Sequence, residues 1–207
     1  MTPDPIPPPA GATPAHPPPA LDRLLDPDGS LYVFAYGSLI WRPGFIPDAV
    51  HPALLRGYHR SFCIRSTHYR GTPETPGLVL GLDRGGACRG AVLRVGGPRA
   101  AEVLAYLHER EMLGGVYHET RLRVRLLDDG REVQALAYVA NRRAADYCGR
   151  ADPAQTAATI ARGQGAMGAN RDYLLQTVAR LRAMGVRDGR LEQLASLLPP
   201  PPAGMEG

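Results

Sequence analysis

The order of the periodic segments constrains the fold of this chain more than any other feature of its sequence. Most strand-like segments come first, and most helix-like segments come last. Apolar runs predict strands at residues 32–36, 53–57, 60–66, 78–82, 89–95, 119–127 and 132–139. Helical spacing predicts helices at residues 98–112, 154–161, 172–184 and 191–198. Strands followed by helices are typical of the α+β class, which we therefore expect.

Turn and cap residues mark where these elements meet. Asp83-Arg84-Gly85-Gly86 predicts a hairpin turn between two strands, and Asp128-Asp129-Gly130 predicts another. Asp152 is suited to cap the helix that follows it, because Pro153 would occupy the first helical position. Gly185 would end the helix that precedes it.

The two ends of the chain differ from the middle in composition. Residues 1–20 are rich in proline and nearly lack large apolar side chains, which indicates a disordered or polyproline-like tail. Residues 199–207 form a similar, shorter tail. The 207-residue chain is 44% hydrophobic, so residues 21–198 are enough for one domain with a substantial core.

All 24 basic residues are arginine, and the chain contains no lysine. This excludes Schiff-base and pyridoxal-phosphate chemistry and a phosphate-binding P-loop, because each needs a lysine amine. The arginines are scattered and do not cluster with aromatic residues, so we expect no binding to nucleic acid. No apolar run reaches the ~18 residues of a membrane span, and we expect no membrane association.

The three cysteines, Cys63, Cys88 and Cys148, are odd in number and lack Cys-x-x-Cys spacing. They fit a reducing cytoplasm and predict neither a disulfide framework nor a zinc site. We expect Cys63 and Cys88 to be small core residues. The six histidines include no pair at metal-ligand spacing on a helix, so we expect no metal.

The apolar run of residues 32–36 ends abruptly in the small residues Gly37 and Ser38. This pattern predicts a core strand that delivers a tight loop to a cleft. Because Gly37 lacks a Cβ, the backbone can approach a ligand there, and successive N–H groups can form an anion-binding nest. The plainer alternative is an ordinary turn at the end of a strand.

One carboxylate lies on the apolar face of the 98–112 helix. Ala100, Val103, Leu104 and Leu107 form the apolar stripe, and Glu111, seven residues after Leu104, falls on the same face. An unpaired carboxylate there is costly, so it should be paired, neutralised or used in chemistry. The alternatives to a catalytic role are a salt bridge with one of the arginines and fraying at the helix end.

Together, several separated motifs resemble those of the ChaC-type gamma-glutamylcyclotransferases, over residues 31–198. One departure is Ala35, where chains of this type usually carry glycine, although related gamma-glutamylcyclotransferases also use alanine. The motifs, in chain order, are Val33-Phe34-Ala35-Tyr36-Gly37-Ser38-Leu39-Ile40-Trp41, Gly57-Tyr58-His59-Arg60, Arg70-Gly71-Thr72-Pro73, Pro76-Gly77-Leu78-Val79-Leu80, Arg110-Glu111-Met112 through Tyr117, Tyr147-Cys148-Gly149 and Asn170-Arg171-Asp172-Tyr173-Leu174.

The resemblance implies a small mixed β-barrel with packed helices and the cleavage of glutathione to 5-oxoproline and cysteinylglycine, without a cofactor. It implies Glu111 as the general base and a substrate-binding loop, with Tyr147 as a further polar contact or a core tyrosine. It also implies a monomer. The residues expected to bind substrate are Val33, Phe34, Ala35, Tyr36, Gly37, Ser38, Leu39 and Tyr147.

Two alternatives stay open at this point. The enzyme could act on other gamma-glutamyl amino acids or gamma-glutamyl amines, because the residues that recognise the Cys-Gly half of glutathione are not evident in the sequence. A regulatory module could also bind gamma-glutamyl ligands without turnover. The inward-facing Glu111 argues against such a module, since a pure binding protein gains nothing from a base there.

Overall fold

The computed structural model describes residues 23–200, which form two compact units. The first unit contains residues 23–64 and 80–149, and the second contains residues 65–79 and 150–200. The expected tail at residues 1–20 lies outside the described residues, as does most of the expected tail at 199–207. The expected domain boundaries therefore stay predictions.

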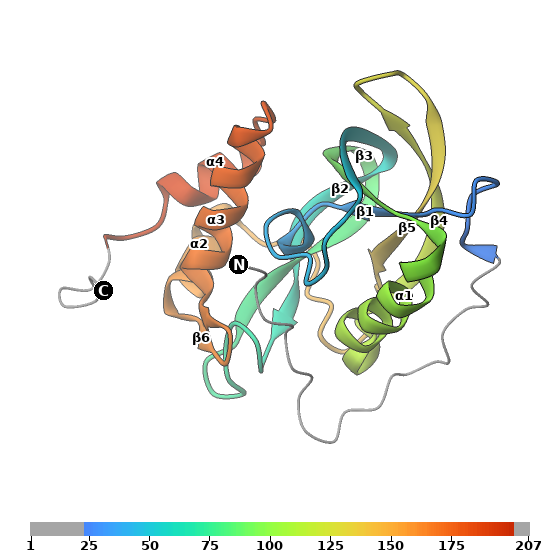
Figure 1. Cartoon of the computed structure of the whole chain (residues 1–207). Coiled ribbons are helices and arrows are strands. Elements are labelled where there is room, and N and C mark those ends of the chain that lie inside the picture. Colours follow the sequence, from blue (N-terminus) through green and yellow to red (C-terminus); the bar gives the residue numbers. More distant parts are fainter. Residues whose placement is uncertain (1–22, 201–207) are drawn as a thin grey trace. The chain divides into compact units, whose positions relative to one another are not determined.

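The first unit is built around a closed barrel of five strands in the order β1-β3-β2-β4-β5 (Figure 1). Antiparallel ladders join β1 to β3, β2 to β4 and β4 to β5, while β1 meets β5 in parallel at Val33 and Leu136. The mixed barrel with helices confirms the expected α+β fold. The strands are β1 (Leu31–Ala35), β2 (Ala49–Ser66), β3 (Gly77–Val95), β4 (Tyr117–Leu126) and β5 (Glu132–Ala140).

Two of the barrel strands are longer than the sequence predicted. The expected hairpin turn at Asp83-Arg84-Gly85-Gly86 is wrong, because these residues lie inside the single strand β3. Gly85 and Gly86 have φ angles of 97° and 73°, and Gly57 in β2 has a φ of 85°. Glycine adopts positive φ without steric cost, so it bends a strand within a ladder as readily as it makes a turn. The predicted strand pairs 53–57 with 60–66 and 78–82 with 89–95 are each one continuous strand.

Helix α1 (Gly97–Glu111) follows β3 and belongs to the same unit (Figure 1). The predicted apolar stripe of Ala100, Val103, Leu104 and Leu107 is buried, as expected from the helical period. Asp48 holds the start of the helix, since its Oδ2 accepts a hydrogen bond of 2.6 Å from the N–H of Gly96. The short 3₁₀ helix η3 (Leu113–Gly115) follows α1.

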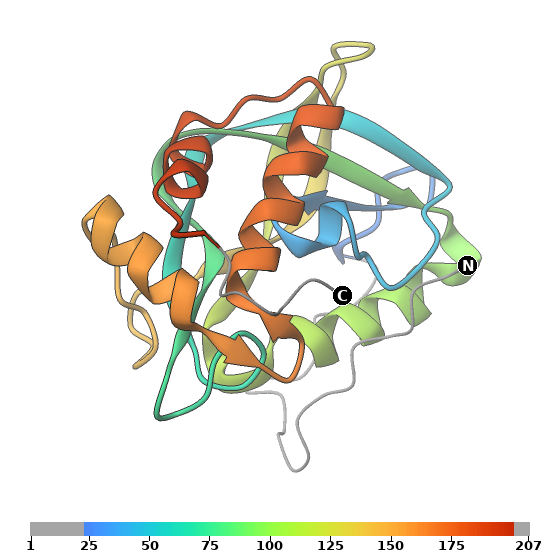
Figure 2. The same ribbon diagram turned by 90° about the vertical axis from the view of Figure 1, so that its left-hand side faces the viewer.

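The second unit contains three helices, drawn in orange and red in Figure 2: α2 (Pro153–Arg162), α3 (Asn170–Ala183) and α4 (Gly189–Ser196). Asp152 caps α2 as predicted, with its Oδ1 accepting hydrogen bonds from the N–H groups of Ala154 and Gln155. The short strands β6 (Gln164–Gly165) and β7 (Gly168–Ala169) pair with each other and were not predicted.

Several motifs of the family resemblance pack against one another inside this second unit. The buried Asn170 side chain accepts a hydrogen bond from the N–H of Leu78 and donates one to its carbonyl oxygen, both at 2.7 Å. The Arg70 guanidinium lies 5.3 Å from the centre of the Tyr173 ring and donates to the carbonyl oxygen of Ala169. A Cβ at Gly77 would lie 2.1 Å from the Arg70 carbonyl oxygen. These motif residues therefore serve the packing of this unit.

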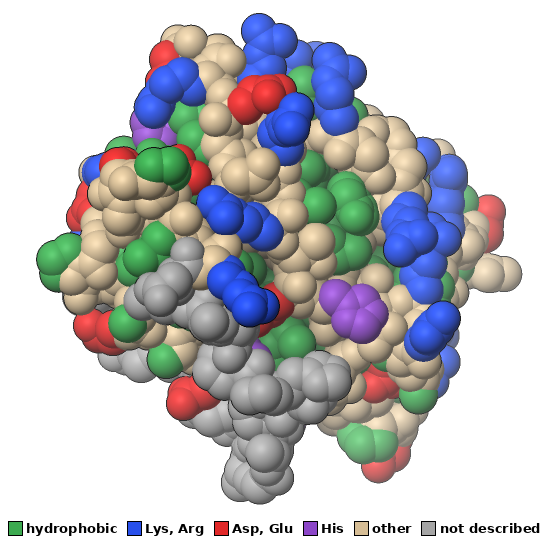
Figure 3. All heavy atoms as spheres, turned by 90° about the vertical axis from the view of Figure 1, so that its right-hand side faces the viewer, with side chains coloured by type: hydrophobic (Ala, Val, Ile, Leu, Met, Phe, Trp, Pro, Cys, Tyr) green, Lys and Arg blue, Asp and Glu red, His purple; other side chains and the backbone are tan. Residues whose placement is uncertain are grey.

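On the face drawn in Figure 3, basic side chains occur at several separate places, with acidic side chains among them. The expectation that the chain does not bind nucleic acid stays a prediction. Within residues 23–200, no helix has the length and apolar character needed to cross a membrane.

Candidate active site

Strand β1 leads directly into the loop that the sequence singled out. The side chains of Val33, Phe34 and Ala35 are fully buried in the barrel, opposite Leu93, Val92 and Ala91 of β3. The chain then turns through η2 (Ser38–Ile40), where Leu39 is buried. The turn's own hydrogen bonds are donated by the N–H groups of Ile40, Trp41 and Arg42 to the carbonyl oxygens of Gly37 and Ser38. A buried strand thus fixes where this loop begins.

Two long-range contacts hold the start of the loop at Tyr36. The Tyr36 hydroxyl donates a buried hydrogen bond of 2.8 Å to the carbonyl oxygen of Tyr138. The Tyr36 carbonyl oxygen accepts one of 3.0 Å from Nε of Arg60, whose side chain also donates to the Arg89 carbonyl oxygen. Arg60 is almost fully buried, so these bonds are shielded from water. Tyr36 is anchored at both its side chain and its backbone.

Glu111 is the last residue of α1, and its side chain is 16% exposed. Burial raises the pKa of the Glu111 carboxyl, and the neighbouring Arg110 opposes this shift through its charge and a hydrogen bond. The shortest distance of the ion pair, from Arg110 Nε to Glu111 Oε1, is 2.9 Å. The salt bridge that was the alternative to a catalytic role therefore exists, and it joins Glu111 to the adjacent residue, Arg110.

Arg110 also contacts the loop after β1. Its Nη2 donates a hydrogen bond of 3.0 Å to the Ser38 hydroxyl oxygen. Its Nη1 donates to the carbonyl oxygens of Arg42 and Pro43 and to the hydroxyl oxygen of Tyr106, at 2.8, 3.1 and 3.1 Å. One buried guanidinium thus joins Glu111 to the loop that contains Ser38.

A second largely buried carboxylate, Glu119 of β4 with a side chain 9% exposed, lies in the same unit. Its Oε1 accepts a hydrogen bond of 3.1 Å from the Tyr138 hydroxyl and lies 3.2 Å from Nδ1 of His108. Burial raises the pKa of the Tyr138 hydroxyl well above its usual range, and the charges of Glu119 and Glu111 add to this shift. The pair of His108 and Glu119 ties the last turn of α1 to the barrel wall.

Tyr147 belongs to a different cluster of polar side chains. Its hydroxyl donates a hydrogen bond of 2.9 Å to Oδ2 of Asp83, while Nε of Arg142 contacts Oδ1 of the same carboxylate at 2.6 Å. Burial acts to raise the pKa of Asp83, but the bonds from Arg142 and Tyr147 hold it below its usual range. The role of Tyr147 in substrate binding stays a prediction.

The thiol of Cys63 does not fit the role of a nucleophile. Burial raises its pKa to about 12, so it is a thiol and not a thiolate near neutral pH. Cys63 and Cys88 are buried, as expected of small core residues, whereas Cys148 is exposed. Within residues 23–200, no group of three or more histidine, cysteine or acidic side chains is placed to hold a metal ion.

The structure thus brings Glu111 and Ser38 together through Arg110. The sequence did not predict the contacts of Arg110, Glu119 and Arg60, although Arg110 and Arg60 lie within the motifs of the family resemblance. The signal that could have identified Arg110 is its place beside an inward-facing glutamate, since a buried carboxylate needs a cation or hydrogen-bond donors.

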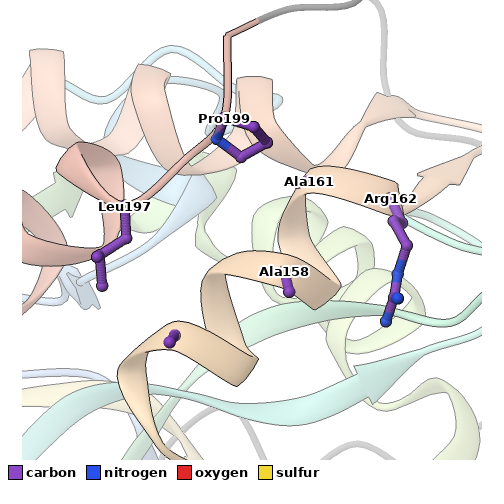
Figure 4. Close-up of a pocket in the computed structure, with 6 residues that line it drawn as sticks. Ala158, Ala161, Arg162, Leu197 and Pro199 are labelled. Carbon is purple, nitrogen blue, oxygen red and sulfur yellow. The ribbon is translucent and has the colours of Figure 1, made fainter.

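A pocket in the second unit has a different character (Figure 4). It has a volume of about 290 Å³ and lies beside α2 and the residues after α4. No carboxylate or histidine lines it, so it offers no base for catalysis. The lining residues are Ala154, Ala158, Ala161, Arg162, Leu197 and Pro199.

Comparisons with known proteins agree on one protein family. The family model described as ChaC-like protein matches residues 31–199. The Escherichia coli protein named glutathione-specific gamma-glutamylcyclotransferase is 34% identical over 167 residues, covering 81% of this chain and 72% of that protein. The Schizosaccharomyces pombe protein of the same name is 33% identical over 178 residues, covering 77% of this chain and 87% of that protein.

Solved structures show the same fold. The crystal structure of a gamma-glutamylcyclotransferase specific to glutathione from yeast superimposes with a TM-score of 0.75 at 24% identity. The match covers 82% of this chain and 95% of the yeast chain. A structure described as gamma-glutamyl cyclotransferase matches with a TM-score of 0.51 at 14% identity, over 82% of this chain and 89% of that one.

Proposed function

Because this chain belongs to the ChaC-like family, we propose that it is a glutathione-specific gamma-glutamylcyclotransferase, which cleaves glutathione to 5-oxoproline and cysteinylglycine. The names of the relatives support the substrate and the reaction. The observation that carries the proposal is the link from Glu111 through Arg110 to Ser38. Through this arginine, a largely buried carboxylate is connected to the loop proposed to bind the substrate.

The reaction needs only acid–base chemistry and positioning. The α-nitrogen of the glutamyl unit attacks its own γ-carbonyl carbon and forms the C–N bond of a five-membered lactam. The C–N bond to the cysteinyl nitrogen then breaks, and that nitrogen receives a proton that the α-nitrogen gives up. The α-amine is largely protonated near neutral pH, with a typical pKa of about 8, so a base must remove a proton before or during attack.

Glu111 is the proposed base. Its pKa is raised by burial, which makes the carboxylate a stronger base near neutral pH than an exposed glutamate. Arg110 occupies Oε1 of this carboxylate, and we assign Oε2 to the α-amine of the substrate. The protonated Glu111 would then return the proton to the leaving nitrogen.

The loop after β1 is the proposed site for the α-carboxylate of the glutamyl unit. The N–H groups of Gly37 and Ser38 precede those that bond within the turn, and the Ser38 hydroxyl lies beside Arg110. Holding this end folds the γ-carbonyl onto the amine, and such orientation contributes about 7–11 kcal/mol to a cyclisation. General-base assistance adds roughly 10²–10⁴-fold, so positioning is the larger effect.

Two alternative functions can be compared with the same site. Action on other gamma-glutamyl compounds is compatible with the same base and loop, because both would contact only the glutamyl half. A binding module without turnover would not use a base, whereas burial makes the Glu111 carboxylate a stronger base by raising its pKa. The glutamyl-directed chemistry therefore favours an enzyme, and the names of the relatives favour glutathione.

Incubation of the purified chain with glutathione tests the proposal. We expect release of 5-oxoproline and cysteinylglycine in equal amounts, and release at least ~10²-fold slower from the Glu111→Gln variant. A panel of gamma-glutamyl amino acids and gamma-glutamyl amines, tested at the same concentration, would identify the substrate if glutathione is not cleaved. Binding of gamma-glutamyl compounds without release of 5-oxoproline would indicate the binding module.

We further propose that the protein is a monomer in the cytoplasm. The family resemblance implies the monomer, and the odd number of cysteines without Cys-x-x-Cys spacing fits a reducing compartment. Light scattering of the purified chain tests the first expectation, and fractionation of cells tests the second.

A further inference from the structure

Arg110 is the residue through which the two halves of the candidate site meet. We propose that Arg110 is a positioning residue that sets both the orientation of Glu111 and the donor direction of the Ser38 hydroxyl. This inference rests on the proposed function and deepens it, since it assigns a role to a residue that does not itself react. Arg110 contacts both functional groups, with distances of 2.9 Å to Glu111 Oε1 and 3.0 Å to Ser38 Oγ.

The contact with Ser38 limits the directions in which its hydroxyl hydrogen can point. Arg110 has only donors, so the Ser38 oxygen must be the acceptor in their hydrogen bond. The hydroxyl hydrogen of Ser38 is then directed elsewhere, and a carboxylate oxygen of the substrate is a suitable acceptor. Without Arg110, the hydroxyl could rotate and this preorganised donor would be lost.

The remaining contacts fix the plane of the guanidinium. Nη1 donates to two backbone carbonyl oxygens, of Arg42 and Pro43, which directly follow the Ser38 turn. It also donates to the hydroxyl oxygen of Tyr106, one helical turn earlier in α1. The Arg110 side chain is only 5% exposed, so these contacts are protected from competition with water. A lysine ammonium cannot reproduce this planar set of donors.

The charge of Arg110 acts on Glu111 within a mixed electrostatic environment. His108 lies on the same helix, Glu119 faces this region from β4, and Tyr138 faces it from β5. Arg110 lowers the pKa of Glu111, whereas burial raises it by more. Removal of the guanidinium therefore raises the pKa further, and the acid limb of the pH profile of kcat/KM should move to higher pH.

Substitution of Arg110 by lysine and by methionine separates geometry from charge. Arg110→Met should move the acid limb upward by about one pH unit or more, because an opposite charge at this distance shifts a pKa by about 1–3 units. Arg110→Lys keeps a positive charge, so the acid limb of its kcat/KM profile should move less. It should still raise KM for glutathione about threefold to tenfold, the equivalent of one hydrogen bond. Arg99→Lys, an exposed ion-pair change on the same helix, is the matched control and should alter neither quantity.

A double-mutant cycle tests the path through Ser38. In the Ser38→Ala background, Arg110→Lys should no longer raise KM, because the hydroxyl that it orients is absent. A folded Arg110→Lys variant with wild-type KM and an unchanged limb would overturn the inference. Equal effects on KM in both backgrounds would also overturn it. A loss of activity at every pH, with the acid limb of the kcat/KM profile unchanged, would do the same, because a purely structural role predicts that result. If Arg110→Met does not fold, the lysine variant and the cycle decide alone.

Carbon-13 NMR of the Glu111 carboxyl keeps this test separate from the proposed function. If the wild-type chain released no 5-oxoproline, the proposed function would fail, yet the carboxyl could still be titrated. A higher pKa in Arg110→Met, or in Arg110→Lys to a lesser extent, would support the positioning role. An unchanged pKa in a folded variant would overturn it.

Discussion

Replacement of Glu111 by glutamine should abolish turnover while leaving the protein about as stable as before. Glutamine keeps the shape of the side chain and an oxygen that can accept from Arg110 Nε, but it cannot take a proton from the substrate amine. We expect turnover to fall at least ~10²-fold, the range that general-base catalysis supplies, while 5-oxoproline still binds.

The expected effect on stability follows from the surroundings of Glu111. Loss of the charge weakens the hydrogen bond with Arg110, at a cost of about 1 kcal/mol. It also removes the cost of holding a charge in a side chain that is 16% exposed. Burial raises the Glu111 pKa despite the opposing charge of Arg110, so the surroundings in the folded chain favour the neutral form of this side chain. We therefore expect a free energy of unfolding within about 1 kcal/mol of wild type, or above it.

The same surroundings predict a pH dependence. The folded state holds the Glu111 proton more tightly than the unfolded state, where the carboxyl titrates near 4.5. As the pH rises from 4.5 through the raised pKa of the folded state, the unfolded state loses its proton first, so this group lowers the stability of the wild type. Above that pKa the contribution is constant. Glu111→Gln should lack this decrease.

Urea melts of wild type and Glu111→Gln between pH 4 and pH 8 measure both effects. Glu109→Gln is the matched control, because Glu109 is an exposed residue of the same helix and should change neither activity nor the pH dependence. A structural salt bridge predicts the opposite result, since removal of one partner of a buried pair costs about 3–5 kcal/mol. Destabilisation of that size in Glu111→Gln, or turnover near the wild-type rate, would refute the reasoning.

Three further predictions concern the loop, the second unit and the N-terminal segment. Gly37→Val should abolish binding of 5-oxoproline in calorimetry by blocking close approach of the backbone, and Ser38→Ala should weaken it by about 1 kcal/mol; unchanged affinity in Gly37→Val would place the site elsewhere. Asn170→Ala should lower the melting temperature, because it leaves the buried N–H and carbonyl of Leu78 without partners at about 1–3 kcal/mol each; a wild-type melt would contradict this. Removal of residues 1–20 should leave melting temperature and activity nearly unchanged, and a large drop in either would show that this segment contributes to the folded protein.

Local patterns were enough to predict the parts of this protein that depend on neighbouring residues. The cap at Asp152 and the buried face of α1 were predicted correctly, since each follows from spacing within a few residues. The α+β class and the family followed from the order of such segments and motifs. The glycines at 85 and 86 show where local patterns fail, because positive φ serves a bend inside β3 as well as a hairpin turn.

Only the tertiary structure decided which side chains meet. Arg110 lies 72 residues from Ser38 in the sequence, and nothing in the spacing of either motif connects them. Tyr147 bonds to Asp83, 64 residues earlier, for the same reason. Helical periodicity predicts that Glu111 faces inward, and its partner Arg110 is the next residue in the chain, but only the fold brings the Ser38 loop to that arginine. The balance of burial and charge that sets the Glu111 pKa therefore belongs to the folded chain, because desolvation depends on every group packed around the carboxyl.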